Sequence, residues 1–237
     1  GTAIGTGINA PAQYQELALA ALSRISQKTI QAAPDLIAAT SDMGDFVLLS
    51  GYLKRSATKL SKIANDLRLL SSGPRAGLNE IHLEPRQPGS SIMPGKVNPV
   101  IPEAMNMAAF QVIANDLAVT LAAEAGQFQL NAMEPLIAFK LFESLDLLQR
   151  SVQMFEQFCV RSIEANIEQC RHNVENSIGI ITALNPYLGY ETTTRLAKTA
   201  HATGQRILDL VRSEGLLSEE ILQHALSVEQ MLQPPLE

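Results

Sequence analysis

Apolar residues recur every three or four positions along most of this chain, which is the period of an amphipathic helix. The longest such run extends from Pro34 to about Leu70 and contains no internal proline. At ~1.5 Å per residue a helix of this length reaches roughly 50 Å, and helices this long usually pack in bundles. Its predicted seam consists of Phe46, Leu49, Leu53, Ala57, Leu60, Ala64 and Leu67.

The same periodicity predicts further helices on both sides of this run. One extends from about Pro11 to Lys28, because proline is favoured in a first helical turn. Two long helices follow at about residues 101–125, which are rich in alanine, and 135–166. Shorter helices are expected at about residues 191–202, 205–214 and 218–225, the last with Ser218 as its N-cap. The pattern predicts an all-α protein: long bundle helices in residues 1–166 and a small helical domain in residues 167–237.

The helical pattern stops in residues 74–99, where prolines and glycines accumulate. Loops longer than ~12–15 residues in a compact domain are usually functional or disordered. The isoleucine, methionine and leucine content of this segment argues against simple disorder. We therefore expect a functional loop at about residues 74–99. Its helix-breaking residues are Pro74, Gly77, Pro85, Pro88, Gly89, Pro94, Gly95 and Pro99.

Composition excludes several classes of function. The chain has 24 acidic against 18 basic residues and no dense basic stretch, so we expect no nucleic-acid partner. No apolar run reaches the roughly 18–20 residues that span a membrane, and we expect no signal peptide. Cys159 and Cys170 lack metal-ligand spacing and are predicted to be core thiols in a reducing cytoplasm. Residues 1–9 lack an initiator methionine and have the character of an internal loop, so we expect a fragment.

Polar residues in the predicted loop suit the binding of a small dianion. A glycine, Gly89, precedes Ser90 and Ser91, and it permits a sharp turn and a close approach to a ligand. Successive loop amides can form an anion-binding concavity. Lys96 and Asn98 can bind a carboxylate by charge and hydrogen bond. An ordinary linker with solvated polar side chains is the alternative interpretation.

Residues 89–98, Gly-Ser-Ser-Ile-Met-Pro-Gly-Lys-Val-Asn, match the GSSxMPxKxN signature of the aspartase/fumarase superfamily at every fixed position. Residues 1–9 resemble a mid-chain loop of that family. The likeness is to its aspartase branch more than to its fumarase branch in residues 69–80, 122–127, 130–131 and 133–135. The resemblance covers nearly the whole chain and identifies it as similar to the C-terminal half of such a lyase.

The resemblance implies an all-α homotetramer and an elimination reaction. L-aspartate would lose ammonia to give fumarate, without an organic cofactor or a bound metal in the site, although a divalent activator such as Mg²⁺ is compatible. Ser90 would be the general base. Lys96, Asn98, Ser91 and Gly89 would bind the substrate, and two further residues would support the site. These are Met93 and Glu103, the second of which matches a family glutamate that orients a polar group from another subunit.

Active sites of this family combine three segments from different subunits, and only the serine loop is found here. The other two are a Ser/Thr-Asn-rich loop and a Thr-His or Thr-Gln segment, so we expect this chain alone to be inactive. Fumarate hydratase activity is an alternative within the family. A non-catalytic helical scaffold is another, although the retention of Ser90, Lys96 and Asn98 argues against it. A free-standing helical interaction module is a third alternative, and it predicts a stable monomer. The long uncovered seam from Phe46 to Leu67 argues against it.

Overall fold

A computed structural model describes residues 2–89, 92–93 and 95–232, and it confirms the all-α class. The chain divides into two compact units, residues 1–72 with 83–163 and residues 73–82 with 164–237. The sequence predicts that residues 167–237 form a separate domain, and this stays a prediction. The helices are α1 (Tyr14–Ser26), α2 (Gly44–Leu70), α3 (Val100–Glu124), α4 (Glu134–Phe158), α5 (Ile167–Asn176), α6 (Asn185–Thr203), α7 (Ile207–Ser213), α8 (Glu219–Ala225) and α9 (Val228–Leu232). Short 3₁₀ helices lie at Ala38–Thr40, Val160–Ser162 and Ile178–Leu184, and two strands at β1 (Ile81–His82) and β2 (Glu164–Ala165).

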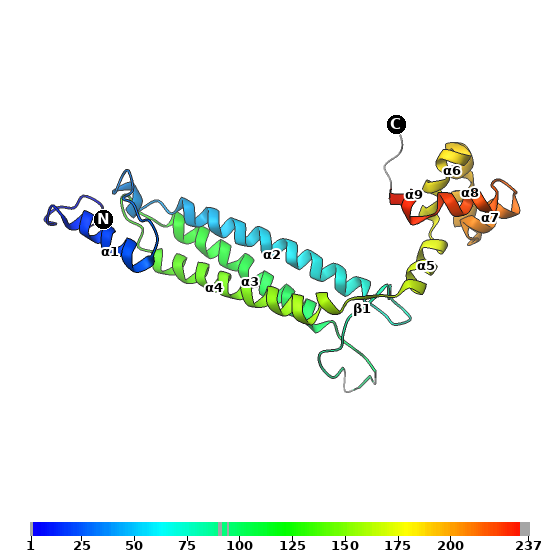
Figure 1. Cartoon of the computed structure of the whole chain (residues 1–237), viewed down its shortest axis with the longest axis horizontal. Helices are drawn as coiled ribbons and strands as arrows, with labels where there is room; N and C mark the ends of the chain where they lie inside the picture. The colour runs from blue at the N-terminus through cyan, green and yellow to red at the C-terminus, as the bar shows by residue number, and fades with distance from the viewer. Residues whose placement is uncertain (1, 90–91, 94, 233–237) are drawn as a thin grey trace. The chain divides into compact units, whose positions relative to one another are not determined.

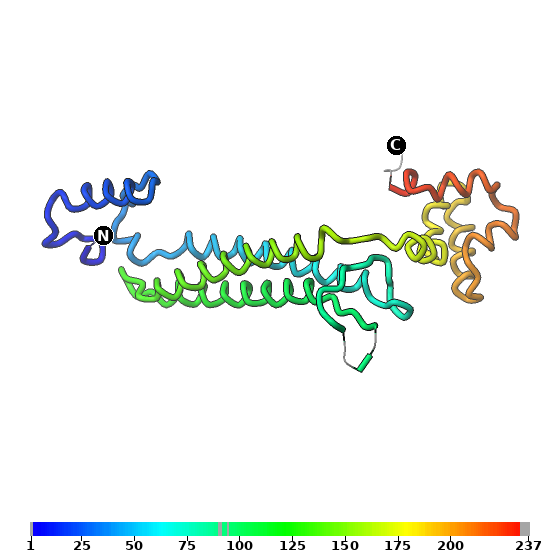
Figure 2. The backbone as a smooth tube through the Cα atoms, turned by 60° about the horizontal axis from the view of Figure 1, so that its bottom comes forward, coloured from blue at the N-terminus to red at the C-terminus, as the bar shows by residue number. Residues whose placement is uncertain are grey.

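In the first unit, α2, α3 and α4 lie side by side as three long helices (Figures 1 and 2). Small side chains let α2 and α3 approach closely, since Ala57 and Ala64 are fully buried in one cluster with Ala109. Larger side chains fill the remaining space, and the burial of such groups is the main force that holds the helices together. They include Met105, Val112, Leu148 and Phe155.

The predicted seam of α2 is only partly covered within the chain. Ala57 and Ala64 are buried, but Phe46 keeps 46% and Leu49 keeps 40% of its surface exposed. Other bulky apolar side chains on these helices are also exposed, and contiguous apolar surface is typical of an interaction site. They include Met107, Phe110 and Leu117 on α3 and Phe139, Phe142 and Leu145 on α4.

Polar pairs between the long helices fix their relative register. Lys54 of α2 pairs with the largely buried Asp116 of α3 at 2.6 Å. The amide of Asn115 donates to Glu143 at 2.9 Å and to the Ser144 hydroxyl at 3.1 Å. Hydrogen bonds from Lys140 and Asn115 lower the pKa of the Glu143 carboxyl from its ordinary value of 4.5. A shift of one helix along the next would break these bonds, and unpaired polar groups at a buried seam are costly.

Two predicted helix boundaries are wrong for local reasons. The helix expected from Pro34 begins at Gly44, because Asp35 and Asp42 accept backbone N–H groups two residues ahead and stabilise turns instead. The helix expected to reach Asn166 ends at Phe158, where Cys159 leaves helical geometry with φ −132° and ψ −63°. Asn166 is instead the N-cap of α5 and accepts the Gln169 N–H.

In the second unit, the segment after α2 packs on α5. Strands β1 and β2 pair antiparallel, with Ile81 opposite Ala165. The carbonyl of Glu80 accepts the Asn166 N–H at 2.9 Å, and its carboxylate accepts the Asn173 amide at 2.9 Å. The predicted N-cap Ser218 is confirmed, because its hydroxyl accepts the Ile221 N–H. The core of this unit includes Leu184, Leu196, Ile207, Val211 and Leu222.

Candidate active site

The candidate site is the loop that leads from Leu83 into α3, which contains the signature residues. Ser90 and Ser91, together with Pro94, lie outside the described residues, so the predicted base and its neighbour have no described geometry. The remaining predicted site residues lie within the described part of the chain.

The loop closes on itself where Gly89 meets Lys96. A β-carbon added to Gly89 would lie 1.4 Å from the Lys96 carbonyl oxygen, so only glycine permits this approach. The Lys96 N–H donates to the Met93 carbonyl at 3.2 Å, and Gly95 turns the chain with a φ of 79°. The structure therefore brings together two of the predicted substrate-binding residues, through their backbones.

The side chains of this loop are open to solvent. Lys96 is exposed, Ile92 keeps 84% of its surface exposed, and Met93 keeps 46%. Asn98 is half-buried and lines a narrow crevice between the loop base and the end of α4. The structure thus places Asn98 at the base of the loop, apart from the exposed apolar side chains that precede Lys96. Exposed apolar residues on a loop are typical of a surface that another element or a ligand covers.

Arg86 anchors the base of the loop, a role that the sequence reasoning missed. Its Nε donates to the Phe158 carbonyl at 3.2 Å, and its guanidinium lies 4.9 Å from the centre of the Phe158 ring. It also pairs with Glu84. A cation next to the last carbonyls of α4 is favoured by the helix dipole. Residues 86 and 158 are too far apart in sequence for any local signal to indicate this contact.

Glu103 lies in the first turn of α3, directly after the loop. Its carboxylate faces Arg68 of α2, with Oε1 at 3.8 Å from Nη2. Arg68 also donates to the Asn106 amide oxygen at 3.2 Å. The sequence indicated Glu103 but not Arg68 or Asn106. The spacing of Glu103 and Asn106, three residues apart on one helix, was the available signal.

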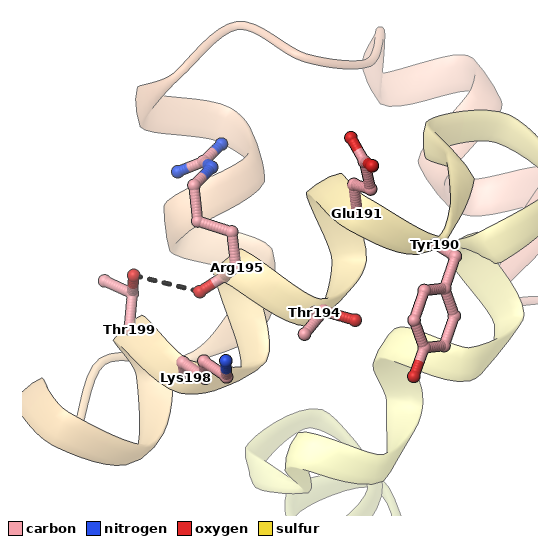
Figure 3. A pocket seen from close by; sticks show the side chains of 6 residues that line it. All are labelled: Tyr190, Glu191, Thr194, Arg195, Lys198 and Thr199. Carbon is pink, nitrogen blue, oxygen red and sulfur yellow. Dashed lines mark hydrogen bonds between the residues drawn. The ribbon is translucent and has the colours of Figure 1, made fainter.

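A separate cavity of about 440 Å³ lies along α6 in the second unit (Figure 3). All its lining residues belong to that one helix, and Arg195 is held by Glu214 at 2.9 Å. This ion pair raises the pKa of Arg195 and lowers that of Glu214. None of the described signature residues is among its lining residues, so the loop remains the candidate site. Its lining is Tyr190, Glu191, Thr194, Arg195, Lys198 and Thr199.

The described residues offer neither a metal-binding cluster nor a membrane-spanning helix. Within residues 2–89, 92–93 and 95–232, no three His, Cys, Asp or Glu side chains gather in a way that could hold a metal ion. In that same part of the chain, none of the helices has the length and apolar character needed to cross a bilayer.

Known proteins resemble this chain from end to end. A lyase family model matches residues 1–114, and one for the C-terminus of fumarase C matches residues 180–233. An aspartate ammonia-lyase from Pseudomonas aeruginosa is 64% identical over all of this chain and half of its own length. A Brucella melitensis fumarate lyase:delta crystallin structure, bound to cobalt, is 53% identical, with a TM-score of 0.90 over 98% of this chain and 50% of its own. A class II fumarase from Schistosoma mansoni is 32% identical, with a TM-score of 0.89 over 99% of this chain and 52% of its own. The chain spans about half the length of the relatives it matches.

Proposed function

Since the chain belongs to the aspartase/fumarase superfamily, we propose that it supplies the serine loop of an aspartate ammonia-lyase. The observation that carries this proposal is the signature in residues 89–98, whose described part closes on itself at Gly89 and Lys96. The proposal that ammonia, and not water, is the leaving group rests on sequence identity. The chain is 64% identical to an aspartate ammonia-lyase and 32% identical to a fumarase. Fumarate hydratase activity is the second candidate, supported by the match of residues 180–233 to a fumarase C-terminus.

In the proposed reaction Ser90 removes a proton from Cβ of L-aspartate. The electron pair moves into the adjacent carboxylate and gives an aci-carboxylate, which then collapses to form the double bond of fumarate. Ammonia leaves from Cα with the electrons of the C–N bond. The two steps together yield fumarate and ammonia and require no oxidant or reductant.

A serine hydroxyl is a poor base at neutral pH, so its surroundings must favour the alkoxide. Backbone N–H groups of the loop and the charge of Lys96 can do so, and more strongly once water is excluded. Lys96 and Asn98, with Ser91 and Gly89, bind a substrate carboxylate in this proposal. The exposed apolar side chains of Ile92 and Met93 support a loop that closes over the substrate, because closure would cover them.

We further propose that the site is complete only in a cytoplasmic homo-oligomer, a tetramer, in which neighbouring subunits supply the other two segments. The exposed apolar side chains of α2, α3 and α4 support this proposal. The 237-residue chain alone is then inactive. Conversion of L-aspartate to fumarate by this purified chain would contradict that.

The test of the function uses the whole protein, with the sequence that corresponds to the other half of the relatives. Purified protein is supplied with L-aspartate and, separately, with L-malate, and fumarate is followed by its ultraviolet absorbance. We expect fumarate and ammonia from L-aspartate and little product from L-malate. Faster conversion of L-malate would establish the hydratase alternative, and no product from either would support a non-catalytic scaffold.

A further inference from the structure

A polar network joins α2 and α3 at the ends of these helices nearest the serine loop. Ser61 and Arg68 lie seven residues apart on α2, and Glu103 and Asn106 lie three apart on α3. Both spacings place a pair on one helix face. The two faces meet in the structure, because Asn106 contacts Ser61 and Arg68 contacts both Asn106 and Glu103.

Asn106 is the fixed point of this network. Its side chain keeps only 3% of its surface exposed. The amide donates to the Ser61 carbonyl at 3.1 Å and to the Ser61 hydroxyl at 2.9 Å. Its oxygen accepts Nη1 of Arg68 at 3.2 Å. A buried amide with both ends occupied cannot turn without losing hydrogen bonds, so it holds Arg68 in one place.

The guanidinium transmits this constraint to Glu103. It is a rigid planar fork, so fixing Nη1 also fixes the position of Nη2. Nη2 lies 3.8 Å from Oε1 of Glu103, and the two side chains keep 42% and 41% of their surface exposed. Ion pairs this exposed contribute little to stability. The contact therefore matters more for where it places the carboxylate than for the stability of the fold.

The backbone of Glu103 is fixed in the first turn of α3, whose N-cap is Pro99. Its N–H donates to the Pro99 carbonyl at 3.2 Å, one residue after the predicted ligand Asn98. With Oε1 facing Arg68, the other oxygen is available to a donor from outside the helix pair. The pair with Arg68 thus orients the carboxylate in the first turn of α3, directly after the loop.

We infer that Arg68 is a positioning residue for Glu103. It holds one carboxylate oxygen so that the other accepts a hydrogen bond from an N–H or O–H donor of a neighbouring segment. The kinetic effect of Arg68 rests on the proposed function, because the donor would complete the shared active site.

The kinetic test is a double-mutant cycle in the whole protein, made from Arg68→Gln, Glu103→Gln and the double variant. Arg68→Gln is expected to lower kcat about 10-fold, because a group displaced by a fraction of an ångström loses productive geometry. The KM for L-aspartate should stay within about twofold, since Arg68 is proposed to act through Glu103 and not on the substrate. The double variant should be no slower than Glu103→Gln alone. Arg68→Lys should recover only part of the loss, because one ammonium cannot replace the fork.

The control is Lys54→Gln, which removes the 2.6 Å pair with Asp116 between the same two helices. It should lower the unfolding temperature and leave kcat unchanged. Losses of kcat that multiply in the double variant would overturn the inference, and so would an Arg68→Gln enzyme with unchanged kcat.

A crystal structure of Arg68→Gln gives a readout independent of turnover, in which Glu103 should leave its original rotamer. If the unaltered protein forms no fumarate, the proposed function fails, while an unmoved Glu103 would overturn the inference by itself.

Discussion

At position 89 the absence of a side chain lets the two ends of the loop approach each other, at Gly89 and Lys96. A β-carbon there would meet the Lys96 carbonyl oxygen at 1.4 Å, so Gly89→Ala forces the two backbones apart. We expect kcat of the whole protein to fall about 100-fold, because the groups around the substrate lose their alignment. Stopped assays with L-aspartate measure the effect.

Gly204→Ala is the control for backbone strain alone. Gly204 has a φ of 73° with open space around it, and it ends α6 far along the chain from the loop. This variant should lose about 1–2 kcal/mol of stability, the cost of a left-handed conformation for alanine, with its turnover unchanged. Equal losses of turnover in both variants would contradict the role given to Gly89.

The two cysteines should differ in reactivity. Cys159 keeps 1% of its surface exposed, and burial raises the pKa of its thiol. Cys170 is half-buried and donates to the Glu80 carbonyl at 3.4 Å. The thiolate is the reactive form, so iodoacetamide should label Cys170 well before Cys159 in the folded protein. Peptide mass spectrometry measures this order, and equal labelling of the two thiols would contradict it.

At the scale of the elements, the α3–α4 contact should depend on pH through Glu143. Its folded pKa is lowered from 4.5, so the stabilisation that it provides is present above that value. It is lost as the pH falls below 4.5 through the folded pKa. Glu143→Gln should therefore lower the unfolding temperature at neutral pH and matter less in acid. Thermal unfolding monitored by circular dichroism from neutral to acidic pH tests whether the difference in unfolding temperature shrinks as predicted.

Asp146→Asn on the same helix is the matched control, because Asp146 pairs with Arg150 at 2.8 Å on an exposed surface. Such pairs contribute about 0–1 kcal/mol, so little change is expected at any pH. A pH dependence that is the same in both variants would contradict the assignment to Glu143.

Local patterns predicted most of the helices, because helix formation depends on neighbours three and four residues apart. The N-cap at Ser218 is such a local feature. Contacts between distant residues left no local signal. Neither the pairing of Ile81 with Ala165 nor the contact of Arg86 with Phe158 could be inferred. The signature predicted the chemistry of the loop, but the close approach of Gly89 to the Lys96 carbonyl could be seen only in the structure.

At the scale of the whole molecule, the exposed apolar faces of the long helices should be covered by other subunits. Phe142 of α4 keeps 71% of its surface exposed. Phe142→Glu should shift the whole protein to smaller species in size-exclusion chromatography with light scattering, because a charge is costly in an apolar interface. Its helical circular dichroism should remain.

Gln153→Glu is the control, since Gln153 is an exposed polar residue of the same helix. It should leave the oligomer intact. A monomeric unaltered protein, or an unchanged oligomer in Phe142→Glu, would contradict the role proposed for this face.

The proposed function depends above all on Ser90, the proposed base of the lyase reaction. The most direct measurement compares the unaltered whole protein with Ser90→Ala and Ser91→Ala, using L-aspartate and fumarate formation. Ser90→Ala should lose about 10²–10⁴-fold or more in kcat, as removal of a general base does, while the oligomer persists. A Ser90→Ala protein that keeps its activity, with Ser91→Ala losing it, would contradict the assignment of the base to Ser90.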